Sequence, residues 1–256
     1  MKLVFFNLRE DEKSALESWR NAHPEVEIDV YTEELSSANK HLLEGKQGVV
    51  LAQNKPFESD VYEYAHEQGI KVFATRSAGF DIYDLELMNK YGIKMTNVPS
   101  YSPNAIAEHV LTTALRISRN TNKIQRNLER HNFSWNPGIL SRELRTLTVG
   151  VIGTGRIGTQ AARLFNGLGS KVLGYDVYKN EAAKEVLTYV ENLDDLIANS
   201  DVITIHMPAI KEYNHMVNDE FISKMKDNSI LLNAARGMLV DTKAVLRALD
   251  SGKLLG

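Results

Sequence analysis

The sequence contains no cysteine, which excludes disulfide bonds, thiolate metal sites and a cysteine nucleophile, and which is compatible with a reducing compartment. The apolar N-terminal run meets Asn7, Arg9 and Glu10 too soon for a signal peptide. No apolar run approaches the roughly 18 residues that a membrane-spanning helix needs. Lys and Arg number 30 against 33 Asp and Glu, so no excess of basic residues is available for a nucleic acid. These absences predict a cytoplasmic protein that binds neither membranes nor nucleic acids.

The 256 residues contain an alternation of short apolar runs and helical patterns, with enough length for two domains of ordinary size. Gly69 and Gly92 each stand between a helical pattern and an apolar run, where a left-handed residue closes a helix. Strands and helices that alternate with short links favour a parallel sheet covered by helices. In the first hundred residues, strands are predicted at 2–7, 27–31, 48–52, 71–75 and 94–98.

Two prolines, Pro99 and Pro103, interrupt this pattern and suit a crossover between domains. We therefore expect a substrate domain over residues 1–101 and a second domain over residues 102–256. Ser102 and Pro103 form a typical helix start, and the apolar spacing after them predicts a helix that runs on into residues 123–130. The alternation restarts at residue 147, so the predicted fold class is α/β with two doubly wound parallel sheets. Strands are predicted at 147–152, 171–175, 201–206 and 229–233, with helices at 156–168, 192–198, 219–224 and 241–251.

A glycine motif, Gly153-Thr154-Gly155-Arg156-Ile157-Gly158, follows a predicted strand and opens a predicted helix, which is the context that a dinucleotide-binding loop requires. The three glycines permit a tight turn, close approach to a pyrophosphate, and close packing of helix on strand, in that order. The helix N-terminus would face the phosphates with its free amides. Asp176 ends the next predicted strand, where a carboxylate would bind the ribose hydroxyls and repel a 2′-phosphate. The motif therefore predicts NAD rather than NADP; the alternative is a glycine-rich turn that binds nothing.

A wider pattern runs along the whole chain. Its stretches are Ser77-Ala78-Gly79-Phe80-Asp81, the run from Asn97 through Tyr101 to His109, the glycine motif, His206-Met207-Pro208, Asn233-Ala234-Ala235-Arg236-Gly237 and Ser251-Gly252-Lys253. This pattern resembles the D-isomer-specific 2-hydroxyacid dehydrogenases, and among them the enzymes of lactic acid bacteria that form D-lactate. The resemblance implies a flavodoxin-like substrate domain, a Rossmann NAD-binding domain, and reversible NADH-dependent reduction of pyruvate to D-lactate. The alternatives are an enzyme for larger 2-keto acids such as 2-ketoisocaproate, and a non-catalytic, NAD-sensing corepressor.

The same resemblance assigns site residues. Arg236 corresponds to the catalytic arginine, and a guanidinium suits a 2-keto acid because it binds a carboxylate bidentately and polarises a carbonyl. Taken alone, an arginine after a strand is more often a surface ion-pair partner. Tyr101 and the amides around Ala78 and Gly79 would bind the same carboxylate, although Tyr101 also suits a hinge between domains. The cofactor residues would be the six of the glycine motif, Asp176, His206, Met207, Pro208, Ala234 and Ala235.

Two features depart from the family's pattern. Tyr213, followed by Asn214, stands where relatives usually carry an asparagine near the cofactor. None of the seven histidines matches the family's proton donor, a histidine paired with a glutamate that follows the segment matching residues 251–253. We therefore expect a C-terminally shortened form that lacks the last strand of its second sheet and the return of the chain to the first domain. Such a form would have weak or no turnover.

Two further expectations concern partners and metals. Trp135 and Pro137 fall where related dehydrogenases make subunit contacts, so the resemblance implies a homodimer through the NAD-binding domain. A buried loop anchor is the alternative role of this pair. No group of His, Asp and Glu has metal-ligand spacing on a shared face, and we expect no metal.

Overall fold

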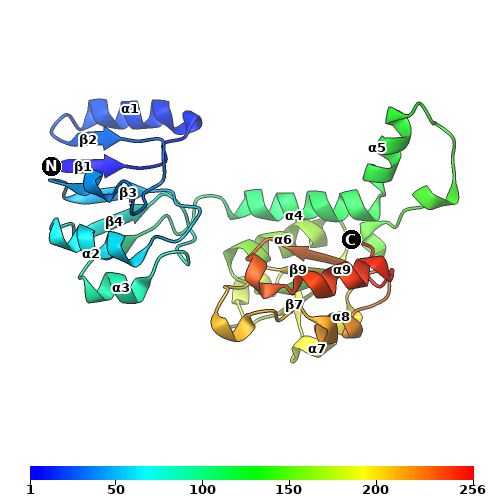
Figure 1. Cartoon of the computed structure of the whole chain (residues 1–256). Helices are drawn as coiled ribbons and strands as arrows, with labels where there is room; N and C mark the ends of the chain where they lie inside the picture. Colours follow the sequence, from blue (N-terminus) through cyan, green and yellow to red (C-terminus); the bar gives the residue numbers. More distant parts are fainter. The chain divides into compact units, whose positions relative to one another are not determined.

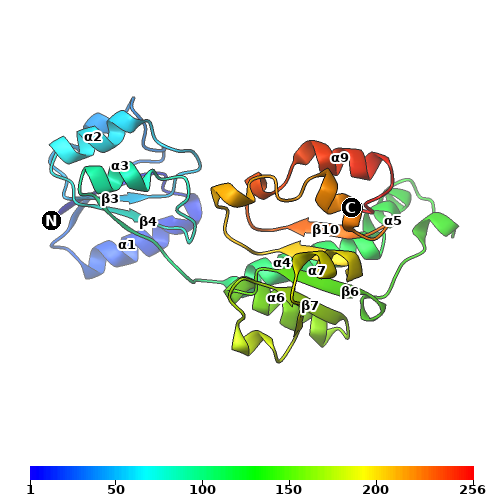
Figure 2. The same ribbon diagram turned by 90° about the horizontal axis from the view of Figure 1, so that it is seen from below.

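The computed structural model describes residues 1–256, and the chain divides into two compact units, Met1–Tyr101 and Ser102–Gly256. Each unit contains one five-stranded sheet with helices on its two faces (Figure 1 and Figure 2). Every strand pair in both sheets is parallel. The α/β fold class that the alternation predicts, with two doubly wound parallel sheets, is confirmed. None of the helices combines the length and the apolar character needed to cross a membrane.

The sheet of the first unit has the order β2-β1-β3-β4-β5, which is the order of flavodoxin-like domains. Helix α1 covers one face, and α2 and α3 cover the other (Figure 1). The strands are β1 (Lys2–Phe5), β2 (Glu27–Val30), β3 (Gly48–Leu51), β4 (Val72–Thr75) and β5 (Lys94–Thr96), and the helices are α1 (Lys13–Ala22), α2 (Ser59–Glu67) and α3 (Leu85–Lys90), with short 3-10 turns at η1 (Glu10–Glu12) and η2 (Lys40–Leu43).

The two faces of this sheet are packed unequally. Val4, Val49 and Phe73 point into a buried cluster that includes Tyr62 and other side chains of α2. On the opposite face, α1 contributes no buried residue. The predicted left-handed turns are confirmed, since Gly69 and Gly92 have φ of 76° and 66° where α2 and α3 end. The face under α1 is therefore the weakly packed side of the unit.

The sheet of the second unit has the order β10-β9-β6-β7-β8. The chain starts at the central strand β6, adds β7 and β8 on one side, and then returns to add β9 and β10 on the other side, as in Rossmann domains. One buried cluster packs α4 and α6 against the sheet, and another packs α7, α8 and α9 against its other face. The strands are β6 (Thr148–Ile152), β7 (Lys171–Tyr175), β8 (Thr188–Tyr189), β9 (Val202–Ile205) and β10 (Ile230–Asn233), and the helices are α4 (Pro103–Ser118), α5 (Thr121–Glu129), α6 (Arg156–Gly167), α7 (Leu193–Asn199), α8 (Asp219–Lys224) and α9 (Thr242–Asp250). Short 3-10 turns lie at η3 (Pro137–Ile139), η4 (Leu144–Thr146), η5 (Glu181–Ala183), η6 (Lys211–Tyr213) and η7 (Gly237–Leu239).

The first helix of this unit is shorter than its spacing predicts. Ser102 caps it as expected, with its hydroxyl accepting from the amide of Ala105 at 3.4 Å. The expected continuation into residues 123–130 is wrong, because Asn120 adopts a left-handed φ of 53° and a separate helix, α5, begins after it. Asparagine is among the few residues that tolerate this conformation. Helix α5 has no buried residue and projects from the second unit (Figure 1).

The residues that follow α9 lie along the edge of this sheet. Leu254 forms a parallel bridge with Ser229, and the carbonyl oxygen of Gly256 accepts from the amide of Leu231 at 3.0 Å. The chain therefore pairs with β10 up to its last described residue.

Candidate functional site

The glycine motif forms the turn between β6 and α6. Gly153 has a φ of 87°, and a Cβ atom on it would lie 2.7 Å from the carbonyl carbon of His206. A Cβ on Gly158 would lie 1.9 Å from the carbonyl oxygen of Gly153. These two glycines are needed for packing within the protein. A Cβ on Gly155, in contrast, would meet no atom within 4 Å, so this glycine leaves open space in front of the N-terminus of α6.

Asp176 is held against this turn. Its Oδ2 accepts from the amide of Thr154 at 2.6 Å and from the Thr154 hydroxyl at 3.2 Å. Its Oδ1 accepts from the amide of Tyr178 at 3.1 Å. An ionised carboxylate has about four lone-pair positions, so these three bonds leave capacity for a ligand hydroxyl. The acid therefore has a fixed place at the carboxyl end of β7, beside the glycine turn.

A polar network behind the turn keeps it rigid, and the sequence did not indicate it. The hydroxyl groups of Thr154 and Tyr189 are 2.6 Å apart, and Tyr189 accepts from the amide of Asn180 at 2.8 Å. The carbonyl oxygen of Thr154 accepts from Thr159 Oγ1 at 2.8 Å and from Asn180 Nδ2 at 3.2 Å. Thr154 itself has no exposed surface. Buried and mutually satisfied polar groups of this kind define a single geometry.

A cavity of about 470 Å³ adjoins the turn. Asp176, Met207 and Pro208 line it, and so does Tyr213, the residue that departs from the family's asparagine. Its remaining walls are mostly apolar, with Ile152 among them. An open glycine, a fixed carboxylate and an apolar cavity side by side suit the phosphates, ribose and flat base of a dinucleotide. The residues present therefore fit such a ligand.

His206 follows β9 and packs on the glycine turn. Its Nε2 lies 2.9 Å from Thr204 Oγ1, while its Nδ1 is buried with no hydrogen-bond partner. Burial lowers the pKa of His206 to about 4, because a charged ring would lose its hydration there. The imidazole is therefore neutral at pH 7, and its single remaining N–H proton is too weakly acidic for a proton donor in catalysis.

Arg236 lies in the loop after β10, at the carboxyl edge of the sheet, and is exposed. Asn233 braces this loop: its Oδ1 accepts from the amide of Ala235 at 3.0 Å, and its Nδ2 donates to the carbonyl oxygen of Arg236 at 2.8 Å. Ala234 packs on one core cluster of the unit and Ala235 on the other. The three residues Ala234, Ala235 and Arg236 thus share one braced loop. Asn233 belongs to a stretch that carries the family resemblance, but its bracing role is visible only in the folded loop.

In the first unit, the loop after β4 presents two backbone amides in a fixed direction. The carbonyl oxygen of Ser77 accepts from the amide of Val98 at 3.1 Å, and that of Ala78 accepts from Asn97 Nδ2 at 2.9 Å. All peptide bonds are trans, so the N–H groups of Ala78 and Gly79 point away from the residues that hold those carbonyls. The Ser77 hydroxyl donates to the carbonyl oxygen of Gly79 at 2.6 Å. Two neighbouring backbone donors held in this way suit a carboxylate.

The candidate residues thus fall into three groups. The glycine motif, Asp176, Met207, Pro208 and His206 gather around one turn in the second unit. Arg236 shares its loop with Ala234 and Ala235. Ala78 and Gly79 lie together in the first unit, and Tyr101, which is 71% exposed, is its last residue. No group of three or more His, Asp and Glu side chains could hold a metal ion.

Comparison with known proteins gives one consistent result. The family model described as D-isomer specific 2-hydroxyacid dehydrogenase, NAD binding domain, matches residues 111–256. A D-lactate dehydrogenase of Treponema pallidum is 49% identical over the whole chain, which spans 77% of that protein; its crystal structure matches with a TM-score of 0.87. An NAD complex of a D-isomer specific 2-hydroxyacid dehydrogenase from Lactobacillus delbrueckii matches with a TM-score of 0.82 at 34% identity, over all of this chain and 77% of that one. A D-2-hydroxyisocaproate dehydrogenase matches with a TM-score of 0.88 at 38% identity, with the same coverage.

Proposed function

Since the chain belongs to the D-isomer-specific 2-hydroxyacid dehydrogenases, we propose that it reduces pyruvate reversibly to D-lactate. It is an NAD-dependent oxidoreductase of 2-hydroxy and 2-keto acids, and its cofactor is NAD. The observation that carries the choice of pyruvate is the 49% identity, over the whole chain, to a D-lactate dehydrogenase. NAD, when bound, supplies or accepts the hydride.

The proposed cofactor residues are those around the glycine turn. The amides of the turn from Gly153 to Gly158 would bind the pyrophosphate, because Gly155 leaves open space there. The carboxylate of Asp176 would accept from the ribose hydroxyls and exclude a 2′-phosphate. The backbone of Met207 and Pro208 would border the cofactor from the neighbouring strand, next to the neutral ring of His206. Ala234 and Ala235 would let their loop pass close to the nicotinamide, since neither side chain extends beyond Cβ.

The proposed substrate residues carry positive charge or free donors. Arg236 would bind the carboxylate of the keto acid and polarise its carbonyl group, since its guanidinium is always charged and presents paired donors. The amides of Ala78 and Gly79 would donate to the same carboxylate, and their direction is fixed by Val98 and Asn97. The hydroxyl of Tyr101 would be a further donor.

Reduction also requires a proton for the carbonyl oxygen. His206 is neutral and its Nδ1 is buried, so it is unsuited to this role at pH 7. We place the proton donor, a histidine paired with a glutamate, outside the 256 residues described. The relatives leave room for such a pair, because the chain spans 77% of the length of the Treponema protein.

The substrate assignment is tested by NADH oxidation in the full-length protein with pyruvate and with 2-ketoisocaproate. We expect kcat/KM for pyruvate to be higher by at least about tenfold, since 2-ketoisocaproate has three more carbon atoms and even one methylene group too many in a fitted pocket costs roughly 1–3 kcal/mol. A reversed preference would assign the protein to larger 2-keto acids, as in the D-2-hydroxyisocaproate dehydrogenase that it resembles. Tight NADH binding without oxidation by either acid would contradict the proposal.

We also propose a homodimer formed through the NAD-binding unit. The segment after α5 exposes large apolar side chains, with Phe133 at 78% and Trp135 at 70%. Leu128 and Leu140 on either side are also exposed. Aromatic side chains in an exposed cluster are typical of subunit interfaces. A second copy of this chain is the partner that the family implies.

A further inference from the structure

Arg76 joins the ends of separate strands in the first unit. It follows β4 directly and precedes Ser77, and its amide donates to the carbonyl oxygen of Leu51 at 2.9 Å. Its side chain reaches back towards β1, where Nη1 donates to the carbonyl oxygen of Phe6 at 3.0 Å and Nη2 to that of Asn7 at 2.7 Å. Strand β3 lies between β1 and β4. The guanidinium therefore ties the carboxyl edge of the sheet across one intervening strand.

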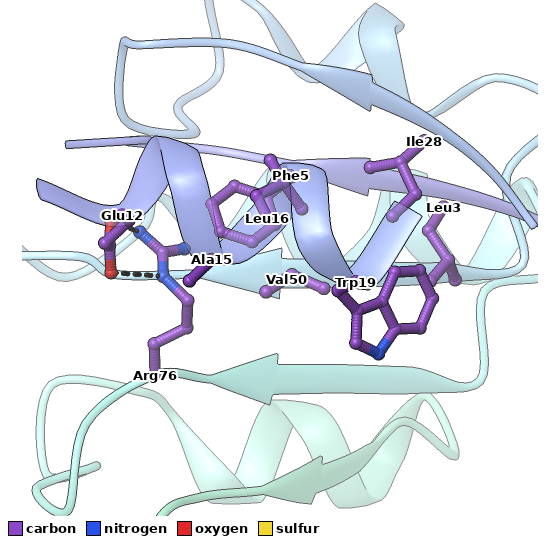
Figure 3. A pocket seen from close by; sticks show the side chains of 9 residues that line it. All are labelled: Leu3, Phe5, Glu12, Ala15, Leu16, Trp19, Ile28, Val50 and Arg76. Carbon is purple, nitrogen blue, oxygen red and sulfur yellow. Dashed lines mark hydrogen bonds and ion pairs between the residues drawn. The ribbon is translucent and has the colours of Figure 1, made fainter. Parts of the chain in front are cut away.

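The same guanidinium pairs with Glu12. Its Nε lies 3.0 Å from Oε1 and its Nη2 lies 2.9 Å from Oε2, so the pair is bidentate (Figure 3). The side chains are only 17% and 18% exposed, and the guanidinium stacks 4.0 Å from the ring centre of Phe5. Burial raises the pKa of Glu12, but the bonds from Arg76 and Arg9 outweigh it and hold that pKa below its usual value. The carboxylate is therefore ionised when folded.

Apolar packing does little to hold this part of the unit. A cavity of about 400 Å³ separates α1 from the sheet, with Leu3, Leu16 and Trp19 among its walls (Figure 3). Arg76 and Glu12 stand together at one end of this cavity, where α1 begins. The start of α1 is thus fixed to β4 chiefly by the ion pair and not by buried side chains.

The backbone at Asn7 turns so that its carbonyl oxygen can accept the hydrogen bond from Arg76. It has a left-handed φ of 54°, which turns the chain at the end of β1. Asn7 also donates from its side chain to the carbonyl oxygen of Ala52, just after β3. Hydrogen bonds from Asn7 and Arg76 therefore link the exits of β1, β3 and β4, in addition to the backbone bond from the amide of Phe6 to the carbonyl oxygen of Val50. A left-handed conformation is uncommon for a residue other than glycine, although asparagine tolerates it, and the surrounding hydrogen bonds hold it in place.

We propose that Arg76, paired with Glu12, is a positioning residue for the loop of Ala78 and Gly79, and thereby for binding of the substrate carboxylate. The inference rests on the proposed role of those two amides. Arg76 does not itself contact the acid in this proposal. It fixes the backbone directly after β4, so that the peptide groups of Ala78 and Gly79 follow from a single chain direction. Loss of this anchor would let both amides move away from the orientations that Val98 and Asn97 support, and the KM for the keto acid would rise.

The test compares Arg76→Met and Glu12→Gln with Lys40→Met in the full-length protein. Lys40 pairs with Asp60 at 2.7 Å in the same unit, so its variant is a matched control for the loss of an ion pair. We expect Arg76→Met to raise the KM for pyruvate about tenfold, to leave the KM for NADH unchanged, and to speed hydrogen exchange of amides 77–83. Glu12→Gln, which keeps the shape of the side chain, should give the same pattern more weakly. Lys40→Met should change none of these.

The outcomes separate this inference from the proposed function. Faster exchange only in α1, with wild-type KM for pyruvate well below the unfolding temperature, would reduce the pair to a stabilising contact and overturn the inference. If Arg76→Met does not fold, Glu12→Gln with an unchanged KM and unchanged exchange overturns it equally. Arg236→Lys is measured in parallel: retained turnover of pyruvate in that variant would contradict the proposed function, whatever Arg76 does. The exchange measurement needs no turnover and therefore tests the loop in either case.

Discussion

The carboxylate of Asp176 accepts hydrogen bonds from both the amide and the hydroxyl of Thr154, at 2.6 and 3.2 Å. The acid at the end of β7 is therefore held by the glycine turn itself. A substitution at either residue should shift the position of the other, because the amide and the hydroxyl of Thr154 both donate to the same carboxylate oxygen of Asp176. Selectivity between the two nicotinamide cofactors and binding of the pyrophosphate are coupled by this contact if NAD binds as proposed.

The charge of Asp176 is expected to set the preference for NADH over NADPH. Asp176→Asn keeps the size of the side chain and an acceptor for Thr154, but it removes the repulsion of a 2′-phosphate. The ratio of the NADPH and NADH dissociation constants should fall by about ten- to thirtyfold, which corresponds to roughly 1–2 kcal/mol for a charge pair near the surface. Fluorescence titration of both cofactors measures it. Asp194→Asn, which removes a surface partner of Lys224, is the control and should leave the ratio unchanged.

Alanine substitutions at Gly155 and Gly158 should distinguish an effect on NADH binding from an effect on the packing of the turn. Gly155→Ala places its Cβ in open space, so the thermal midpoint should stay within a few degrees while NADH binding weakens at least about tenfold. Gly158→Ala forces a Cβ to within 1.9 Å of the Gly153 carbonyl oxygen, so this variant should unfold several degrees lower. Calorimetry and NADH titration on both variants check this. Unchanged NADH affinity in Gly155→Ala would show that no phosphate lies against this residue.

His206 should make the protein less stable in acid. Its pKa is about 4 when folded and 6.5 in the unfolded chain, so the unfolded state binds an extra proton between these values. The free energy of unfolding should therefore fall by roughly 3 kcal/mol as the pH drops from 6.5 to 4, and this contribution should be constant above pH 6.5. Chemical denaturation of the wild type and of His206→Gln at several pH values measures it. An equally steep loss in His206→Gln would assign the acid sensitivity to other groups.

The exposed aromatic residues after α5 should hold the proposed dimer together. Trp135→Glu adds a charge to an apolar contact, so the double variant with Phe133→Glu should elute as a monomer where the wild type elutes as a dimer. Leu246→Glu, at an exposed position on α9, is the control and should leave the size unchanged. Sedimentation or light scattering reports the mass. A wild type that is monomeric at micromolar concentration would refute the dimer directly.

Much of the fold could be predicted from the sequence, because its signals are local. Apolar runs and helical spacing located the strands and most helices, and glycines such as Gly69 and Gly92 marked helix ends by their left-handed turns. The end of α4 was missed because Asn120, unlike a glycine or proline, gives little warning of a left-handed conformation. The two-residue strand β8 is too short to show a periodicity.

The supporting contacts of the candidate site could not be predicted in this way. Asn97 holds Ala78 from 19 residues away, and Tyr189 meets Thr154 across 35 residues. Such partners are brought together by the pairing of strands, which no short window of sequence contains. Motif and resemblance therefore indicate which residues face a ligand, whereas the residues that hold them in place emerge only from the folded chain.

The span of Arg76 also constrains the order in which the first unit can fold. Its bonds to the carbonyl groups of Phe6 and Asn7 close chain separations of 70 and 69 residues. Strands β3, β4 and β5 can pair through shorter connections, but the side chain of Arg76 cannot form these two bonds until β1 has been inserted beside β3. Contacts between distant residues are slow to form because the intervening chain must first be closed into a loop. The loop after β4 is therefore expected to be among the last parts of the unit to reach its final shape, because its connection through Arg76 forms only after β1 has paired with β3.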